Sequence, residues 1–284
     1  MSLASLTVVF VLAQLPPGPT SEVPRSSCSR DTLAGLPEGP TSVPYADADF
    51  ATGRRACLRS EGGLGVQGGL VIDSPKFYGD VAVGGLVFGS YVFRPGWEVF
   101  GTLEAPHYEL VQNATLRGTA LSVGQLAAGT THTVWSDAHW TLSPSVRVLL
   151  PTSSASAYAR VVGAELGLAA QRRFHGKVVA YGYAGLDGMF GISAAPANFR
   201  GGGLLKLGAE YDLTRGFGLA VDLQAHLGRR AVLDELAPAL ALRFAVGREF
   251  GGELTASAPV AGADRHDAVF ALRLAYRFAD PSGR

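Results

Sequence analysis

Six histidines and the serines near them are the side chains of this sequence whose types could perform catalysis. The histidines show neither the His-x-x-x-His nor the His-Glu-x-x-His spacing that holds a catalytic metal. No Gly-x-Ser-x-Gly turn occurs, and the nearest pairing for nucleophilic catalysis is Ser143 or Ser145 with His139, which a channel lining explains more simply. Gly201–Gly203 with Lys206 lacks the spacing of a phosphate loop. We therefore predict that the protein is not an enzyme and needs no cofactor or metal.

Charged side chains, in contrast, recur singly between apolar residues at alternate positions. In Leu240–Val246 the apolar side chains at alternate positions share one face of an extended strand and Arg243 takes the other, because strand side chains alternate with period two. An arginine or lysine facing lipid at mid-bilayer costs about 2–4 kcal/mol, so the charged face of a membrane-spanning strand must point inward. The polar side chains that this reasoning assigns to an enclosed lumen are Arg147, Glu165, Lys206, Glu210, Asp222, His226, Arg243 and Arg273. Because the charges are mixed in sign, we expect little selectivity for ion charge.

These side chains belong to twelve alternating segments, joined by connections that are alternately short and long. The segments are Glu61–Ile72, Phe77–Phe93, Trp97–Val111, Gly118–Trp135, Ala138–Leu150, Tyr158–Arg173, Lys177–Ile192, Arg200–Leu213, Gly216–Leu227, Leu236–Gly247, Phe250–Pro259 and Asp267–Phe278. This rhythm is typical of an all-β fold, a transmembrane antiparallel up-and-down β-barrel over residues 61–278. Gly118–Trp135 and Lys177–Ile192 are too rich in small residues for their faces to be assigned, and Pro144 counts against an unbroken fifth strand. The alternative is a soluble β protein with ordinary core aromatics.

Composition favours the membrane interpretation. The chain is 47% hydrophobic and 17% charged, yet its longest apolar stretch, Val8–Ala13, is well short of the roughly 18 residues that a transmembrane helix needs. Any crossing of a membrane must therefore use strands. A formal net charge of zero, from 24 basic and 24 acidic residues, gives no indication of nucleic-acid binding.

The N-terminal part is different in character. Leu3–Ala13 resembles the core of a secretory signal, so we predict a signal peptide over residues 1–13, although the usual positive residues before it are missing. Either the true start lies upstream or this segment is buried in the folded protein. Residues 14–60 are proline-rich and are predicted to form a periplasmic linker, and residues 279–284 a short tail. Cys28 and Cys57 form a disulfide in an oxidising periplasm or remain two free thiols.

One stretch of sequence resembles a known family. Thr141–Thr152, which reads TLSPSVRVLLPT, resembles the strand ending in Leu-Pro-Thr-Gly of outer-membrane proteins grouped with the meta-cleavage pathway of phenol degradation, with Ser153 in place of the glycine. Val123–Gly129 is similar to that family's Gly-Asp-Leu strand, with Gln125 where an aspartate is usual. The resemblance covers Gly118–Phe278. It implies a barrel that passes small solutes, apolar or aromatic ones among them.

Together these features predict a bacterial outer-membrane channel or facilitator for the passive passage of small solutes, with the lipid bilayer and the solute as its partners. Side chains fill eight-stranded barrels and barrels of about 16 strands hold an aqueous channel, so twelve strands predict a narrow pore or one filled by paired charges. The alternative is a closed structural or surface-interaction barrel locked by salt bridges. The two differ in whether opposite charges pair across the lumen.

Overall fold

The computed structural model describes residues 28, 54–71, 79–112, 117–123, 126–150, 152, 161–174, 177–191, 199–214, 216–228, 233–246, 249–262 and 268–278. These residues form fourteen strands of one antiparallel sheet. In chain order they are β1 (Glu61–Val71), β2 (Gly79–Arg94), β3 (Trp97–Gln112), β4 (Arg117–Ser122), β5 (Leu126–His132), β6 (Trp135–Ser136), β7 (Trp140–Leu150), β8 (Val161–Phe174), β9 (Val178–Gly191), β10 (Phe199–Thr214), β11 (Phe217–Leu227), β12 (Leu233–Val246), β13 (Phe250–Ser257) and β14 (Ala268–Arg277). The predicted signal peptide, most of the predicted linker and the C-terminal tail lie outside the described residues.

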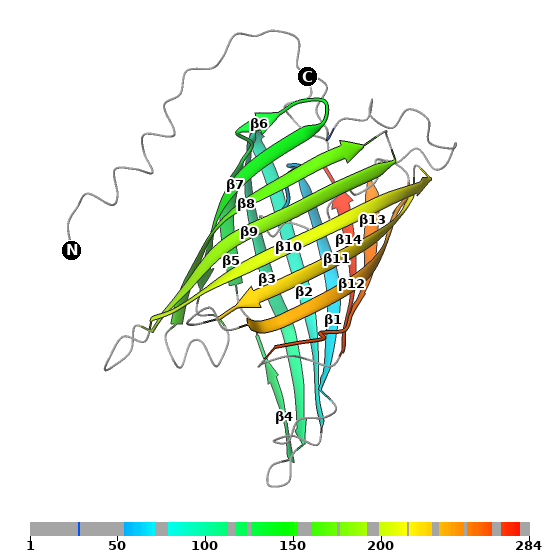
Figure 1. Ribbon diagram of the computed structural model, residues 1–284. Helices are drawn as coiled ribbons and strands as arrows, with labels where there is room; N and C mark the ends of the chain where they lie inside the picture. Colours follow the sequence, from blue (N-terminus) through cyan, green and yellow to red (C-terminus); the bar gives the residue numbers. More distant parts are fainter. Residues whose placement is uncertain are drawn as a thin grey trace, which may run out of the picture.

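The sheet closes on itself. Strand β1 pairs with β14 from Glu61↔Arg277 to Leu70↔Ala268, and it also pairs with β2 on its other side. β4 and β5 both pair with β3, while β5 and β6 both pair with β7, so these three short strands occupy one place in the ring. The result is a closed barrel of twelve strands with a strong tilt (Figure 1), as the sequence predicts. Closure matters because β1 and β14, which would otherwise be the edge strands, satisfy each other's backbone hydrogen bonds instead of facing lipid.

The observed strands follow the predicted ones within a few residues, with one difference. The segment predicted as a single strand, Gly118–Trp135, is divided into β4, β5 and β6. The interruption between β5 and β6 lies opposite Pro144, which stays within β7. Proline has no N–H for the ladder, so the sheet accommodates it where the neighbouring strand is broken.

The two ends of the barrel differ. Tight turns gather at one end, such as Pro95–Gly96, where Gly96 has a φ of 75° that favours glycine. The first and last strands meet at the same end, where Phe278 N donates to Ser60 O at 3.0 Å. By the usual arrangement of such barrels this is the periplasmic end. At the opposite, external end β4 and the ends of β2 and β3 project beyond the barrel (Figure 1).

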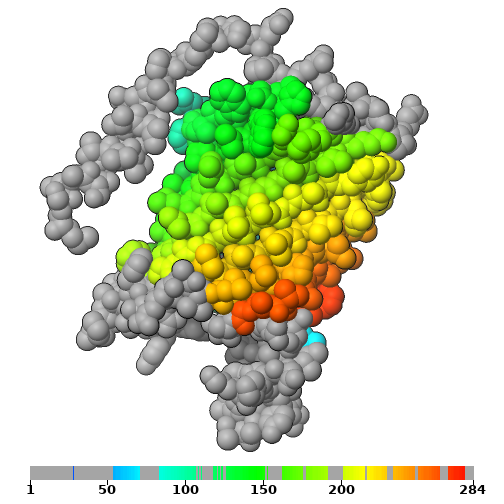
Figure 2. Space-filling model, in the orientation of Figure 1, coloured from blue at the N-terminus to red at the C-terminus, as the bar shows by residue number. Residues whose placement is uncertain are grey.

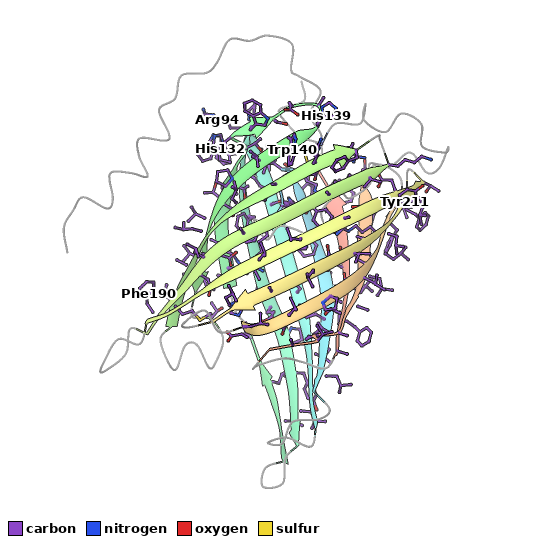
Figure 3. All side chains as sticks on the ribbon, in the orientation of Figure 1. Arg94, His132, His139, Trp140, Phe190 and Tyr211 are labelled. Atoms are coloured by element: carbon purple, nitrogen blue, oxygen red, sulfur yellow. A yellow bond between two sulfur atoms is a disulfide. The ribbon has the colours of Figure 1, made fainter. Side chains whose placement is uncertain are left out.

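The outer and inner faces differ in chemistry as the alternation predicts. Large apolar side chains are exposed around the outside, for example Val221 at 55% and Leu240 at 59%. The space-filling view shows β7–β14 as one continuous tilted wall (Figure 2). The aromatic side chains Trp140 and Tyr211 lie toward one end and Phe190 toward the other (Figure 3), the places of the aromatic girdles of membrane barrels. Among the described residues, no helix has the length and apolarity needed to cross a bilayer.

Candidate functional site: the barrel lumen

A short stretch before β1 runs inside the barrel. We call Arg54–Ser60 the luminal segment. Arg55 is 0% exposed, and its guanidinium pairs with Glu61 of β1 and, at 2.9 Å, with Glu98 of β3. The same side chain donates to Ser90 Oγ of β2 at 3.0 Å. Burial alone lowers the pKa of this guanidinium, but attraction to the two carboxylates raises it above its ordinary value. Arg55 therefore stays charged and fixes the segment to β1–β3.

The luminal segment also contacts the opposite wall. Arg54 Nε and Nη2 donate to the two carboxylate oxygens of Glu165 in β8, at 2.9 and 2.7 Å. Its guanidinium lies 5.9 Å from the ring centre of Tyr183 in β9. Ser143 Oγ of β7 donates to the carbonyl of Ala56 at 2.7 Å. The segment thus bridges β1–β3 and β7–β9 near the periplasmic end. The sequence predicted residues 14–60 as a linker. The last of these residues, Arg54–Ser60, lie within the barrel because Arg54 and Arg55 form ion pairs with carboxylates of the wall.

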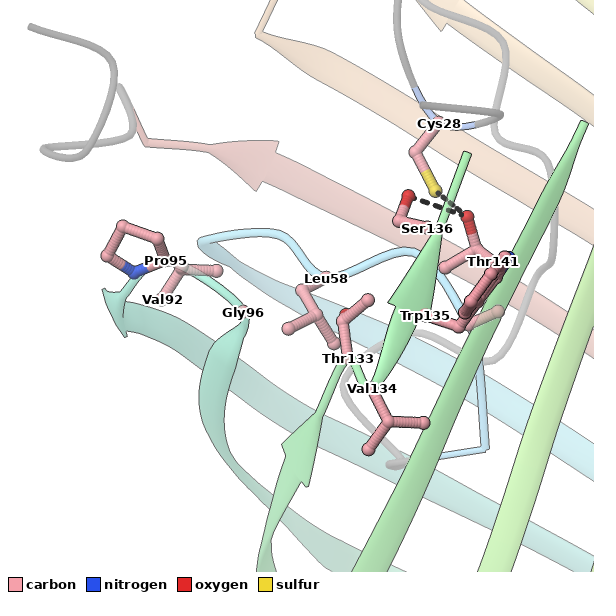
Figure 4. A pocket seen from close by; sticks show the side chains of 11 residues that line it. Cys28, Leu58, Val92, Pro95, Gly96, Thr133, Val134, Trp135, Ser136 and Thr141 are labelled. Carbon is pink, nitrogen blue, oxygen red and sulfur yellow. Dashed lines mark hydrogen bonds between the residues drawn. The ribbon is translucent and has the colours of Figure 1, made fainter. Parts of the chain in front are cut away.

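A disulfide and a pocket adjoin this segment. The structure joins Cys28 and Cys57, with a Cα–Cα distance of 5.7 Å, where the sequence left a disulfide and free thiols open. Cys28 Sγ lies 3.5 Å from Thr141 Oγ1 of β7 (Figure 4). A pocket of about 380 Å³ opens between Leu58 of the luminal segment and the periplasmic turns, with Trp135 in its wall. Cys28 is therefore held at the periplasmic rim by its disulfide to the luminal segment.

A larger cluster of charges lies in the wall of β9–β14. We call it the Arg243 cluster. Arg243, 1% exposed, pairs with Glu210 of β10 and with Glu253 of β13 at 3.1 Å. It also donates to Tyr181 Oη at 2.9 Å, and Tyr181 in turn donates to Asp222. Lys206 and Arg273 join the edges of the cluster: Lys206 Nζ lies 5.6 Å from the Tyr181 ring centre, and Arg273 Nη1 lies 3.4 Å from Glu253 Oε1.

The remaining predicted lumen residues lie elsewhere. Arg147 is 3.5 Å from Glu165, so both join the contacts of Arg54 rather than the Arg243 cluster. His226 lies toward the external end, where its Nε2 is 3.8 Å from Asp187 and its Nδ1 is 3.3 Å from Asp234. The eight predicted side chains therefore occupy three separate places along the lumen.

The direction of the ion pairs is informative. Pairs between wall residues of the described chain join strands that are adjacent or two apart: Arg147–Glu165 joins β7 and β8, and Arg243–Glu210 joins β12 and β10. They run along the wall. The described contacts that cross from one wall to the other are those of the luminal segment.

Apolar side chains also face the lumen. Phe88 of β2 and Phe100 of β3 form a buried cluster with Ala245 and Ala275, and Leu86 packs against it. A Cβ on Gly63 would lie 2.4 Å from the Phe88 ring. The Phe88 ring therefore packs directly against the backbone of Gly63, in space that a side chain would occupy. The inner face of β1–β3 thus carries both buried apolar packing and the carboxylates that bind Arg55.

Several residues at this site were not singled out from the sequence. Arg54 and Arg55 stood in the presumed linker, and the available signal was a pair of adjacent arginines that ends six positions before Glu61, the start of the first strand. Tyr181 and Tyr183 stood in a segment whose faces were left unassigned. Their spacing of two, with buried Val179, was the available signal.

Comparisons with known proteins bear on the fold. No family model matches the chain, and no curated relative matches it either. The COG4313 outer membrane channel from Pseudomonas putida F1 is similar over 82% of this chain and 100% of its own, with a TM-score of 0.66 and 12% identity. The β domain of the Bordetella autotransporter BrkA is similar over 77% of this chain and 99% of its own, with a TM-score of 0.52 and 12% identity. The chain therefore has the fold of a bacterial outer-membrane β-barrel.

Proposed function

We propose that the protein is a narrow channel or facilitator for passive passage of small solutes across the bacterial outer membrane. One observation carries the proposal: among the described residues, the ion pairs between strands run along the wall, and the contacts that cross the lumen are those of the luminal segment. Buried charges need partners of opposite sign. Because the charged side chains of the wall find these partners on nearby strands, they do not need to pair across the lumen and block it. The similar channel from Pseudomonas putida supports the same function.

The proposed solutes are small and apolar or aromatic. Support comes from the apolar character of part of the interior, where Phe88 and Phe100 pack with Ala245 and Ala275 on the inner face of the wall. The likeness of Thr141–Thr152 to barrels grouped with the meta-cleavage pathway agrees with this class and stays a prediction. The mixed charges of the wall favour neither ion sign.

A closed structural barrel is the second candidate, favoured by the burial of Arg55 and both of its carboxylate partners at 0% exposure. Under this alternative the luminal segment is a permanent part of the core. The candidates differ in whether solute can pass.

Proteoliposomes test the proposal. Vesicles containing the purified protein should take up a phenol-sized neutral aromatic faster than protein-free vesicles, and faster than they take up a sugar of twice its mass. Vesicles with heat-unfolded protein are the control. Uptake equal to the control for every solute would remove the channel and leave the closed barrel.

A further inference from the structure

The outer wall of the barrel carries a groove near its periplasmic end. The groove has a volume of about 440 Å³ and crosses β1, β2 and β3. Its floor is formed by Gly62, Gly89 and Gly101, which lie side by side because Gly62 pairs with Gly89 and Gly89 pairs with Gly101. Its rim includes Tyr91 and Phe278, exposed at 48% and 51%. The groove therefore opens toward lipid rather than toward the lumen.

The glycines of the floor are not required by the backbone. None of the three has the positive φ that favours glycine. A Cβ on Gly89 would lie 3.6 Å from the Glu61 carbonyl oxygen, and one on Gly101 would lie 3.6 Å from that of Ala127, both ordinary contacts. Glycine within a strand weakens it, so a side chain at either position would be expected to fit and to stabilise the wall. The space is instead left open.

In a bilayer, apolar groups of another molecule must fill this groove, because the side chains and backbone that line an empty groove would lose dispersion contacts on one side. The groove is continuous with the surface that meets the hydrocarbon, and its rim is aromatic and aliphatic. A positive charge lies along the same strand: Arg94 ends β2, is exposed, and makes no ion pair within the described part of the chain (Figure 3). Arg94 lies five positions beyond Gly89, about 17 Å along a strand, which is comparable to the length of an acyl chain.

We propose that this groove binds one glycerophospholipid of the inner leaflet, with an acyl chain over Gly89 and Gly101 and the phosphate against Arg94. The lipid completes the outer surface of β1–β3 at a point where the wall lacks side chains. Trp97, next to Arg94 across the turn and 6.5 Å from the Phe93 ring centre, lies at the level of the headgroups, where such aromatics are favoured.

Native mass spectrometry of protein purified from its own membranes in a mild detergent tests the proposal. The wild type should retain one phospholipid per chain. The double substitution Gly89→Leu/Gly101→Leu should reduce retention about tenfold or more, because each methylene excluded from the groove costs about a factor of four in affinity. Arg94→Gln should reduce it about threefold, as loss of an exposed charge contact does. Ala209→Leu, an exposed change on β10 away from the groove, is the matched control and should retain the lipid.

Folding is checked by the shift in gel mobility on heating, which reports the intact barrel. If the double variant does not fold, Gly89→Ala, whose Cβ the structure accommodates, should still lower retention measurably. Equal retention by the groove variants and the Ala209→Leu control would overturn the proposal. So would a wild-type protein without bound phospholipid, including one whose mass shows a second copy of the chain instead.

Discussion

Arg55→Ala probes how firmly the luminal segment is held. Arg55, Glu61 and Glu98 are all 0% exposed, so the substitution leaves two carboxylates buried without their main partner. Breaking a buried ion pair in this way costs about 3–5 kcal/mol. Arg59 offsets part of the loss, since its backbone N–H donates to Glu98 at 2.8 Å and its Nε lies 4.0 Å from Glu61. We therefore expect Arg55→Ala to lower the free energy of unfolding by about 3 kcal/mol, the lower end of that range.

The assay is urea unfolding of the protein folded into lipid vesicles, followed by gel mobility. Arg54→Ala is the matched control: Arg54 is 28% exposed, and its partner Glu165 keeps Arg147 and Tyr183. We expect Arg54→Ala to lower the free energy of unfolding by about 1 kcal/mol or less. Replacing Arg55 by Met together with Glu61→Gln and Glu98→Gln should restore most of the stability, because no buried charge then lacks a partner. Equal effects of Arg54→Ala and Arg55→Ala, or no effect of either, would refute the reasoning.

Four further predictions test other parts of the account. Glu165→Gln should shift the reversal potential in a salt gradient toward anion selectivity, because it removes the negative charge between two arginines; an unchanged potential would contradict the assignment. Arg243→Met should lower the free energy of unfolding by about 3–5 kcal/mol, since its carboxylate partners are also buried. Val221→Arg should cost about 2–4 kcal/mol in vesicles, whereas Gln224→Arg, which faces the lumen, should cost far less. Cys57→Ser should raise channel conductance less than Arg55→Ala does, because the ion pairs rather than the disulfide hold the luminal segment; the reverse order would show the disulfide to be the main restraint.

The barrel could be predicted from the sequence because its outer face meets lipid and its inner face meets a polar lumen. The outer face therefore carries apolar side chains and the inner face carries the charged ones. A residue such as Arg243, between Leu242 and Phe244, admits only one orientation in a bilayer, and each strand is long enough to repeat that choice several times. The tight turns carried their own signal, as at Pro95–Gly96. These local rules predict the twelve places in the barrel wall and the facing of the strands that carry a charged residue, whereas the division of Gly118–Trp135 into β4, β5 and β6 follows from the pairing opposite Pro144.

The contacts of the lumen could not be predicted in the same way. Whether Arg243 meets Glu210 or another carboxylate depends on the register of strands far apart in sequence, which alternation leaves open. The luminal segment was harder still, because its neighbours in sequence are proline-rich and resemble a linker. Arg54 and Arg55 enter the barrel through long-range pairing with β1, β3 and β8, and no local pattern encodes that pairing.

The central claim is that the barrel encloses a path narrowed by the luminal segment. Single-channel recording in planar bilayers tests it most directly, with wild-type protein and Arg55→Ala measured under identical conditions. The account predicts small conductance steps for the wild type and larger steps for the variant. Folded barrels that give no steps in either form would contradict it.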